Sequence, residues 1–249
     1  MGDDDFDGNI SYLNRRVGFF TGTFWAWKNY EKLGNPEYFG SMGYRRLLFP
    51  CCLNNIEKYD LIIPKKKFFR ETLKLQMIKC HGKLFYDIMI DTIEHVYPDD
   101  ADNVKFYFNR HSGYFAEMYI MKKEIFFEFC NWMLKILNYL VKKYPNAISV
   151  PQEESCGVET LLKNFIGHDL DLSDKETDIR DFAFIIERLT GYFLYKLTCN
   201  KIYKYNEVYI FEPDYISSIC EKENYKALVL NKMRQNVLSS LKRGNTTER

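Results

Sequence analysis

Two adjacent arginines follow a short apolar segment in the first fifth of the chain. Residues 38–42 have the composition of a β-strand, and Tyr44-Arg45-Arg46 comes directly after them. In open α/β sheets ligands bind at the carboxyl ends of the strands, and the planar fork of arginine suits phosphate. Tyr44, Arg45 and Arg46 are therefore candidates for binding a phosphate group. The alternative is a pair of surface arginines bonded to nearby carboxylate or carbonyl oxygens.

Two glutamates stand in apolar surroundings. Glu117 lies within the string YFAEMYIM, and Glu187 lies within FAFIIERL beside Arg188. Desolvation raises the pKa of a carboxyl group unless a cation lies beside it. A carboxyl group with a raised pKa is suited to act as a general base. Both glutamates are catalytic candidates. The alternatives are an ion pair of Glu187 with Arg180 or Arg188, and an outward-pointing Glu117 on a half-exposed strand.

Other polar residues with possible chemistry are less specific. Trp25 and Trp27 are two positions apart in a predicted helix, so they cannot share a face. One is expected in the core and the other, with Lys28, could reach a site; the alternative is core packing of both. His81 stands alone at a helix break, where a structural role is the default. Lys65 is the first of three consecutive lysines after a predicted strand. A run of lysines is usually solvated.

The acidic N-terminus could suggest a metal site. Asp3, Asp4, Asp5 and Asp7 lie close together, and hard cations need several carboxylate oxygens on a fixed backbone. A chain terminus is a poor scaffold for such a site, so we expect a solvated acidic tail. None of the seven cysteines has C-x-x-C spacing, which makes a zinc site improbable and indicates reduced thiols. We therefore expect no bound metal.

Composition limits the class of protein. The chain has 249 residues, and its 35 basic and 34 acidic residues leave a net charge of +1. This balance argues against a dedicated nucleic-acid binder, which usually has a basic excess. Aromatic residues make up 17%, which allows a sugar or base binder. Neither a signal peptide nor an apolar run of membrane-spanning length is found, so we expect a cytoplasmic protein.

The candidate residues must be positioned by alternating strands and helices. Periodicity and breaker residues predict helices at 21–30, 71–80, 83–95, 122–143 and 178–198, and strands at 38–42, 59–63, 114–121 and 207–211. Thr21 or Thr23 is expected to cap the first helix. Strands that alternate with long helices predict an α/β fold with a largely parallel sheet.

Several strings occur in an order that is specific to one family. They are NISYLN…TFWAWKN (residues 9–29), YFGSMGYRR (38–46), YDLIIPKKK (59–67) and MYIMKKEIFFEFCNWMLKIL (118–137), followed by Arg180, Phe184 and Glu187-Arg188-Leu189. This order resembles bacterial glycosyltransferases of capsular polysaccharide and O-antigen synthesis. The resemblance spans about residues 1 to 211.

The resemblance implies a GT-A-like sheet that binds a nucleotide sugar. Tyr44-Arg45-Arg46 stands where most such folds carry a metal-binding Asp-x-Asp, so the donor diphosphate would be held without a metal or cofactor. The acceptor would be a lipid-linked glycan or an oligosaccharide, with no nucleic acid involved. The implied catalytic residues are Glu187 and Glu117, and the implied donor-binding residues are Asn9, Ser11, Trp27, Lys28, Tyr44, Arg45, Arg46, Lys65, His81, Arg180 and Arg188.

The chain also departs from the family pattern. It starts inside the first motif, so the first strand is expected to be missing, and an inactive, truncated transferase is the alternative reading. Gly43 stands where a histidine is usual, and Glu117 stands where asparagine is common. We expect a transferase-like domain at 1–215, and a C-terminal helix and tail at 216–249.

The C-terminal segment has an apolar stripe with basic flanks. Apolar residues recur at three- and four-residue steps between 226 and 242, and Lys232, Arg234 and Lys242 surround them. Such a helix could dock peripherally on the inner face of the cytoplasmic membrane. The alternative is that the stripe packs on this domain or on a second copy of the chain.

Overall fold

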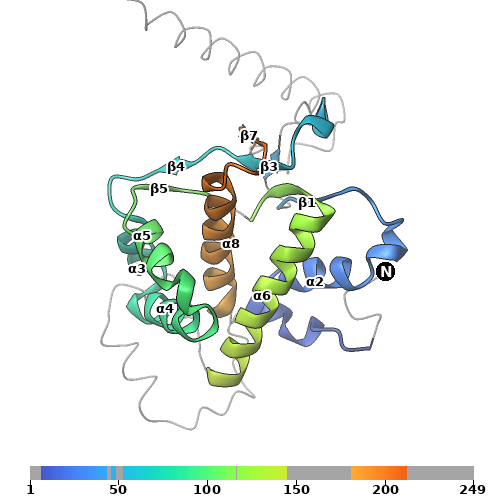
Figure 1. Cartoon of the computed structure of the whole chain (residues 1–249). Helices are drawn as coiled ribbons and strands as arrows, with labels where there is room; N and C mark the ends of the chain where they lie inside the picture. Colours follow the sequence, from blue (N-terminus) through green and yellow to red (C-terminus); the bar gives the residue numbers. More distant parts are fainter. Residues whose placement is uncertain (1–6, 44–45, 49–52, 116, 145–180, 212–249) are drawn as a thin grey trace, which may run out of the picture. The chain divides into compact units, whose positions relative to one another are not determined.

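The computed structural model describes residues 7–43, 46–48, 53–115, 117–144 and 181–211, which are coloured in Figure 1. The chain divides into two compact units, Met1–Ile210 and Phe211–Arg249. The architecture below is that of the first unit, and the C-terminal helix expected at 226–242 lies outside the described residues.

A four-stranded mixed sheet forms the centre of this unit. Its strands are β1 (Tyr38–Ser41), β6 (Tyr119–Lys122), β3 (Leu61–Pro64) and β7 (Tyr205–Val208), in that order across the sheet. β6 is antiparallel to both β1 and β3, and only the pair β3–β7 is parallel. The prediction of a largely parallel sheet is therefore wrong. After β3 the chain passes through three helices and re-enters the sheet at the edge where β3 ends, so β6 must run in the opposite direction.

The sheet separates two apolar clusters. Side chains alternate between the faces of a strand, and Leu61 and Ile63 accordingly belong to the large core that also contains the helices. Ile62 and Ile120, which are paired across β3 and β6, belong to a smaller cluster with Leu48 and Met118. Both faces are covered, which explains why β3 is buried along its whole length.

The helices lie together against the sheet. They are α1 (Asn14–Val17), α2 (Phe20–Lys28), α3 (Leu73–His81), α4 (Lys83–Val96), α5 (Ala101–Phe108), α6 (Lys123–Lys143) and α8 (Asp181–Cys199). In Figure 1, α8 stands below the strands, with α6 on one side and α3, α4 and α5 on the other. No helix among these combines the length and apolar character needed to cross a bilayer.

The structure also contains two short strand pairs. β4 (Lys67–Phe68) pairs antiparallel with β5 (Ser112–Gly113), and β2 (Leu47–Leu48) pairs with β8 (Ile210–Phe211). The predicted strand 114–121 is wrong in its first half, because β6 begins only at Tyr119.

The predicted helices are confirmed with small shifts, and their causes are visible. The break at His81-Gly82 is real, because Gly82 has φ 92° between α3 and α4. The predicted cap of α2 is wrong: Phe19 is the N-cap residue, and Thr21 and Thr23 are buried within the helix. Helix α5 was not predicted, because its eight residues are too few to show a clear apolar period.

The close approach of α8 to the segment before β6 is a testable feature. A Cβ on Gly191 would overlap the carbonyl oxygen of Tyr114. We expect Gly191→Ala to lower the free energy of unfolding by about 1–3 kcal/mol, because backbone atoms must shift. The measurement is urea denaturation.

Gly22 on α2 provides the matched control, since a Cβ there meets no atom within 4 Å. Gly22→Ala should leave stability unchanged or raise it by about 0.5–1 kcal/mol, because alanine is the better helix former. Equal stability of the Gly191→Ala variant and the parent would contradict the close approach.

Candidate functional site

One edge of the sheet collects several residues that the sequence marked. β1, β3 and β7 end at this edge and β6 begins there, as the pairs Ser41↔Tyr119 and Pro64↔Val208 show. Arg46 follows β1, Lys65 follows β3, and Glu117 precedes β6. The structure therefore brings segments from four strands to the edge where ligands of α/β sheets bind.

The basic residues at this edge are held by the strand ends. The backbone N–H of Arg46 donates to the carbonyl of Gly43 at 3.2 Å, and Arg46 is exposed. The N–H of Lys65 donates to Val208 at 2.8 Å and extends the β3–β7 ladder. The Lys65 ammonium lies 4.0 Å from the centre of the Tyr209 ring. Tyr44 and Arg45 lie outside the described residues.

Glu117 has an unusual backbone and an unusual environment. Its φ of 47° lies in the left-handed region, which glutamate seldom adopts. Desolvation raises the pKa of its carboxyl group well above 4.5, and the charge of Glu187 raises it further. Residues with a strained backbone and carboxyl groups with a raised pKa cluster at functional sites. Glu117 therefore remains a catalytic candidate.

Helix α8 brings the second glutamate to the same place. Gly191 lies against the carbonyl of Tyr114, and Glu187 stands one turn earlier on the same face of the helix. In keeping with this placement, the negative charge of Glu187 contributes to the raised pKa of Glu117. We call Glu117 and Glu187, which are 70 positions apart in the sequence, the carboxyl pair.

Behind this pair, Arg188 and His81 join α8 to the end of α3. Arg188 Nη2 lies 3.3 Å from His81 Nε2, and its guanidinium lies 4.5 Å from the centre of the Phe115 ring. Desolvation, with the charge of Arg188, lowers the pKa of His81 to about 4, so neutral His81 accepts this hydrogen bond. Arg188 is 6% exposed, and its Nε and Nη1 have no hydrogen-bond partner among the described residues.

This arrangement gives His81 and Arg188 a structural contact that the sequence did not predict. The imidazole also stacks on Phe184, with ring centres 4.0 Å apart. The pair fixes the helix that carries Glu187. That either residue touches a donor phosphate stays a prediction.

A second polar group at the edge was missed from the sequence. The Tyr114 hydroxyl donates to Glu207 Oε1 at 2.7 Å, and Lys66 Nζ lies 3.8 Å from the same oxygen. Burial, reinforced by this hydrogen bond, raises the pKa of Tyr114, which keeps its proton. The only signal in the sequence is a tyrosine and a glutamate in separate strand-like segments, and nothing local reveals that they meet.

The remaining predicted residues lie elsewhere or outside the described part. Trp27 packs edge-on against Phe127, near the start of α6. Helix α6 follows the end of β6 that is opposite to the Glu117 end. Lys28 Nζ lies 4.0 Å from the centre of the Trp27 ring. The structure therefore does not bring Trp27 and Lys28 to the carboxyl pair. Trp25 is buried, so one tryptophan in the core is confirmed. Arg180 lies outside the described residues.

Asn9 and Ser11 form a local turn. Asn9 Oδ1 accepts from the N–H of Ser11 at 3.2 Å and from its hydroxyl at 2.6 Å. This turn precedes α1, which packs on α8, the helix of Glu187. A role of Asn9 and Ser11 in donor binding stays a prediction.

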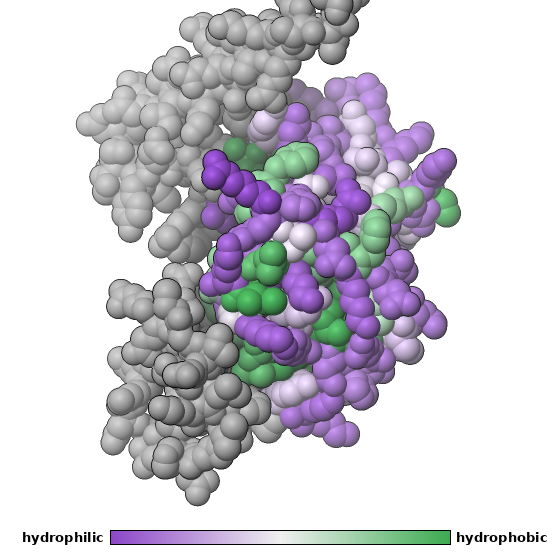
Figure 2. Space-filling view, turned by 90° about the vertical axis from the view of Figure 1, so that its left-hand side faces the viewer, coloured by the Kyte–Doolittle hydropathy of each residue, from purple (hydrophilic) through white to green (hydrophobic). Residues whose placement is uncertain are grey.

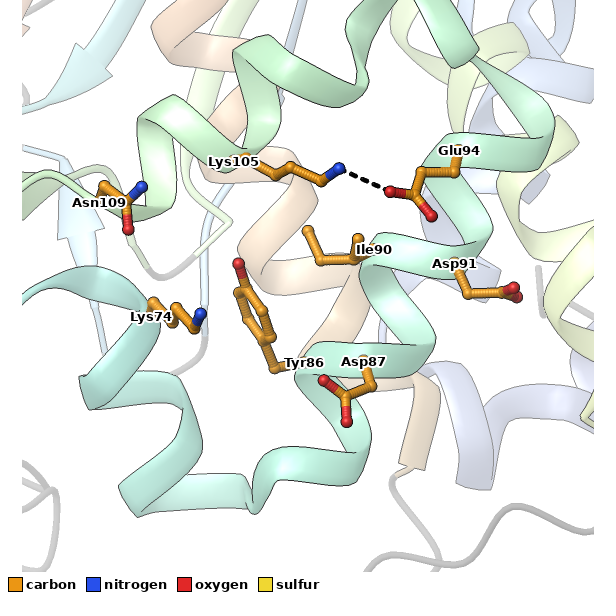
Figure 3. Close-up of a pocket in the computed structure, with 8 residues that line it drawn as sticks. All are labelled: Lys74, Tyr86, Asp87, Ile90, Asp91, Glu94, Lys105 and Asn109. Atoms are coloured by element: carbon orange, nitrogen blue, oxygen red, sulfur yellow. Dashed lines mark ion pairs between the residues drawn. The ribbon is translucent and has the colours of Figure 1, made fainter.

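A hollow of about 360 Å³ lies on a different part of the surface (Figure 3). Tyr86 and Ile90 stand on α4 between Lys74 of α3 and Lys105 of α5. Lys105 pairs with Glu94 at 2.6 Å across the hollow. None of the residues marked in the sequence lines it, so it is not a candidate for the same chemistry. Among the described residues, no group of three or more His, Cys, Asp or Glu side chains could hold a metal.

The environment of Glu117 predicts a pH-dependent stability. A carboxyl group with a raised pKa in the folded state stabilises it fully below the ordinary pKa, and this contribution is lost as the pH rises through the raised value. Glu117→Gln removes the ionisation. We therefore expect the variant to gain stability relative to the parent as the pH rises above 4.5, by about 1.4 kcal/mol per unit of pKa shift.

Unfolding by urea at several pH values checks this prediction, with Glu128→Gln as the control. Glu128 is exposed on α6, so its variant should follow the parent at every pH. A stability difference between Glu117→Gln and the parent that does not change with pH would show that the Glu117 carboxyl is solvated.

The fold is similar to that of a known transferase. A solved structure described as an apo form of the WbbM bifunctional glycosyltransferase superposes with a TM-score of 0.61 at 23% sequence identity. The match covers 86% of this chain and 39% of that protein, so the chain spans well under half of its length. This likeness shows a GT-A-like α/β fold. No curated protein matches the chain.

The family is shown by a sequence match. Residues 1–154 match the model of a family described as a domain of unknown function, DUF4422. The matched part contains β1, β3, β6 and the helices α1 to α6, and it therefore includes Arg46, Lys65, His81 and Glu117. Since the match covers more than half of the sequence, the chain belongs to the DUF4422 family.

Proposed function

We propose that the chain is a glycosyltransferase that moves a sugar from a nucleotide-sugar donor to a glycan acceptor. The observation that carries the proposal is the convergence of exposed basic residues and a half-buried carboxyl pair at one edge of a GT-A-like sheet. The likeness to a glycosyltransferase fold supports it. The resemblance of the motif strings supports an acceptor that belongs to a surface glycan, either lipid-linked or free, and a cytoplasmic location.

Each part of the edge has a task in this reaction. Arg46 and Lys65, with Arg45, would hold the donor diphosphate, because cationic donors neutralise the charge that develops on the leaving group. No metal is assigned to this step. The acceptor hydroxyl oxygen attacks the anomeric carbon, and the bond from that carbon to the diphosphate oxygen breaks. The nucleoside diphosphate leaves with the bonding electrons, and the hydroxyl proton passes to the pair Glu117–Glu187.

Replacement of Arg46 tests the phosphate contact. We expect Arg46→Ala to weaken nucleoside diphosphate binding by about 1.5–3 kcal/mol, because a charge-assisted hydrogen bond is lost. Calorimetry with a panel of nucleoside diphosphates measures this, and a chelator should leave the affinity unchanged. Lys58→Ala is the control, because Lys58 is exposed at the opposite end of β3.

The result has clear contrary outcomes. If the folded parent chain binds no nucleoside diphosphate at millimolar concentration, the transferase proposal is wrong and the inactive remnant is the better reading. If the parent binds a nucleoside diphosphate and the Arg46→Ala variant binds it with the same affinity, the diphosphate is held elsewhere. A requirement for manganese or magnesium would contradict the metal-free site.

Replacement of Glu187 separates catalysis from binding. Glu187→Gln should lower the rate of sugar transfer by about 10²–10⁴-fold, the usual contribution of a positioned acid or base. The affinity for the nucleotide should stay that of the parent. The assay uses the nucleotide sugar that the binding panel selects, with Glu124→Gln on the exposed side of α6 as the control. Full activity of the Glu187→Gln variant would remove this residue from the mechanism.

A further inference from the structure

Several cations lie beside the sheet edge, on the segment that follows β3 and on the one that follows α5. We name Lys67, Arg70, Lys74 and Arg110 the basic patch. Backbone hydrogen bonds hold its two segments together: the N–H of Phe69 donates to His111, and the N–H of Leu73 donates to Arg110, both at 2.8 Å. The antiparallel pair β4–β5 continues the same contact. The patch is therefore one surface made of two distant parts of the sequence.

Three cations of the basic patch lie over aromatic rings. Lys67 Nζ lies 5.6 Å from the centre of the Phe69 ring, Lys74 Nζ 5.0 Å from that of Tyr86, and Arg110 Cζ 5.1 Å from that of Tyr195. Lys67 and Arg70 are exposed, and Lys74 and Arg110 are half-buried. The basic patch can therefore donate to anionic groups from outside.

Nearby carboxylates have other cationic partners. Glu71 pairs with Lys79, and Glu207 lies 3.8 Å from Lys66. On α4, Asp87, Asp91 and Glu94 pair with Lys83, Lys143 and Lys105. The chain as a whole carries a net charge of only +1, so the basic patch is a local excess of positive charge.

Large apolar side chains protrude beside the cations. Phe68, between Lys67 and Phe69, is 78% exposed, Phe106 one turn before Arg110 is 59% exposed, and Leu75 beside Lys74 is 47% exposed. Figure 2 looks onto the side of the molecule that carries β4, β5 and α3 to α5, where apolar side chains emerge among hydrophilic ones. Apolar side chains that are grouped on one surface, unlike scattered single ones, offer contact to an apolar partner.

We propose that the basic patch with Phe68, Leu75 and Phe106 docks on a bilayer that contains anionic phospholipids. Lysine and arginine contact the headgroups, and the exposed rings enter the boundary of the acyl chains. A nucleic acid would also meet cations and aromatic rings, but Leu75 offers no stacking face. Because β4 follows directly from the end of β3, this docking would hold the edge with Lys65 and Glu117 near the membrane surface.

Sedimentation of the full chain with vesicles tests the proposal. The parent should pellet with vesicles of phosphatidylglycerol and phosphatidylcholine, and not with phosphatidylcholine alone. Each cation near a surface contributes roughly a fivefold change in affinity. The double variant Lys67→Gln/Arg70→Gln should therefore bind on the order of 25-fold more weakly, and Phe68→Ser should bind more weakly than the parent.

Matched controls come from other exposed residues. Lys32→Gln/Lys142→Gln removes two exposed cations elsewhere, and Ile202→Ser replaces a side chain that is 79% exposed. Both variants should bind vesicles like the parent. Lys67→Arg/Arg70→Lys keeps the charge and should retain binding, which separates charge loss from misfolding.

Several outcomes would overturn the proposal. They are no pelleting of the parent with anionic vesicles, equal loss in the control variants, or loss in the charge-preserving variant. Binding to single-stranded RNA that the double variant loses, without vesicle binding, would assign the basic patch to nucleic acid instead. Vesicle binding is measured without nucleotide. A negative result therefore does not bear on the transferase proposal, which is tested separately by calorimetry.

Discussion

Helix α8 can lie against the segment before β6 only because residue 191 is glycine, whose missing Cβ leaves room for the carbonyl of Tyr114. The other features of the site depend on this approach. It sets Glu187 beside Glu117, and it places Arg188 over Phe115 and against His81. Helix α8 also lies between α6 and the helices α3 to α5, so the contact connects the site to the main core.

The site holds polar groups whose burial opposes stability. Arg188 is almost fully buried, and its one hydrogen-bond contact within the described ranges is to a neutral histidine. Glu117 combines a left-handed backbone with a desolvated carboxyl group. Incompletely paired buried charges are costly, and the surrounding aromatic core must offset that cost. Strained residues and carboxyl groups with raised pKa values cluster at functional sites.

The direction of β6 explains how one edge serves several tasks. Because β6 runs antiparallel to its neighbours, the loop that precedes it lies beside the ends of β1, β3 and β7. The residues that we propose for charge neutralisation and for proton transfer therefore reach one place from strands of opposite direction. The same edge continues into β4, so the proposed membrane-facing surface and the proposed catalytic edge share a short stretch of chain.

The sequence by itself determined the long helices, the position of most strands and the family resemblance. Apolar residues at helical spacing predicted α6 and α8, and local strings such as TFWAWKN and GYRR carried the likeness. Local patterns also marked Glu117, Glu187, Arg46 and Lys65 as candidates. A polar residue within an apolar run, or directly after a strand, is recognised from its sequence neighbours without knowing what it contacts in the fold.

Only the tertiary structure decided what these residues meet. The sheet is mixed because strand direction depends on where the chain returns, which periodicity does not encode. Trp27 and Lys28 face α6, and His81 contacts Arg188, because helix packing joins residues more than 90 positions apart. The bond from Tyr114 to Glu207 likewise depends on the parallel register of β3 and β7. Such long-range pairings leave no local pattern, since their energy arises only when the chain is folded.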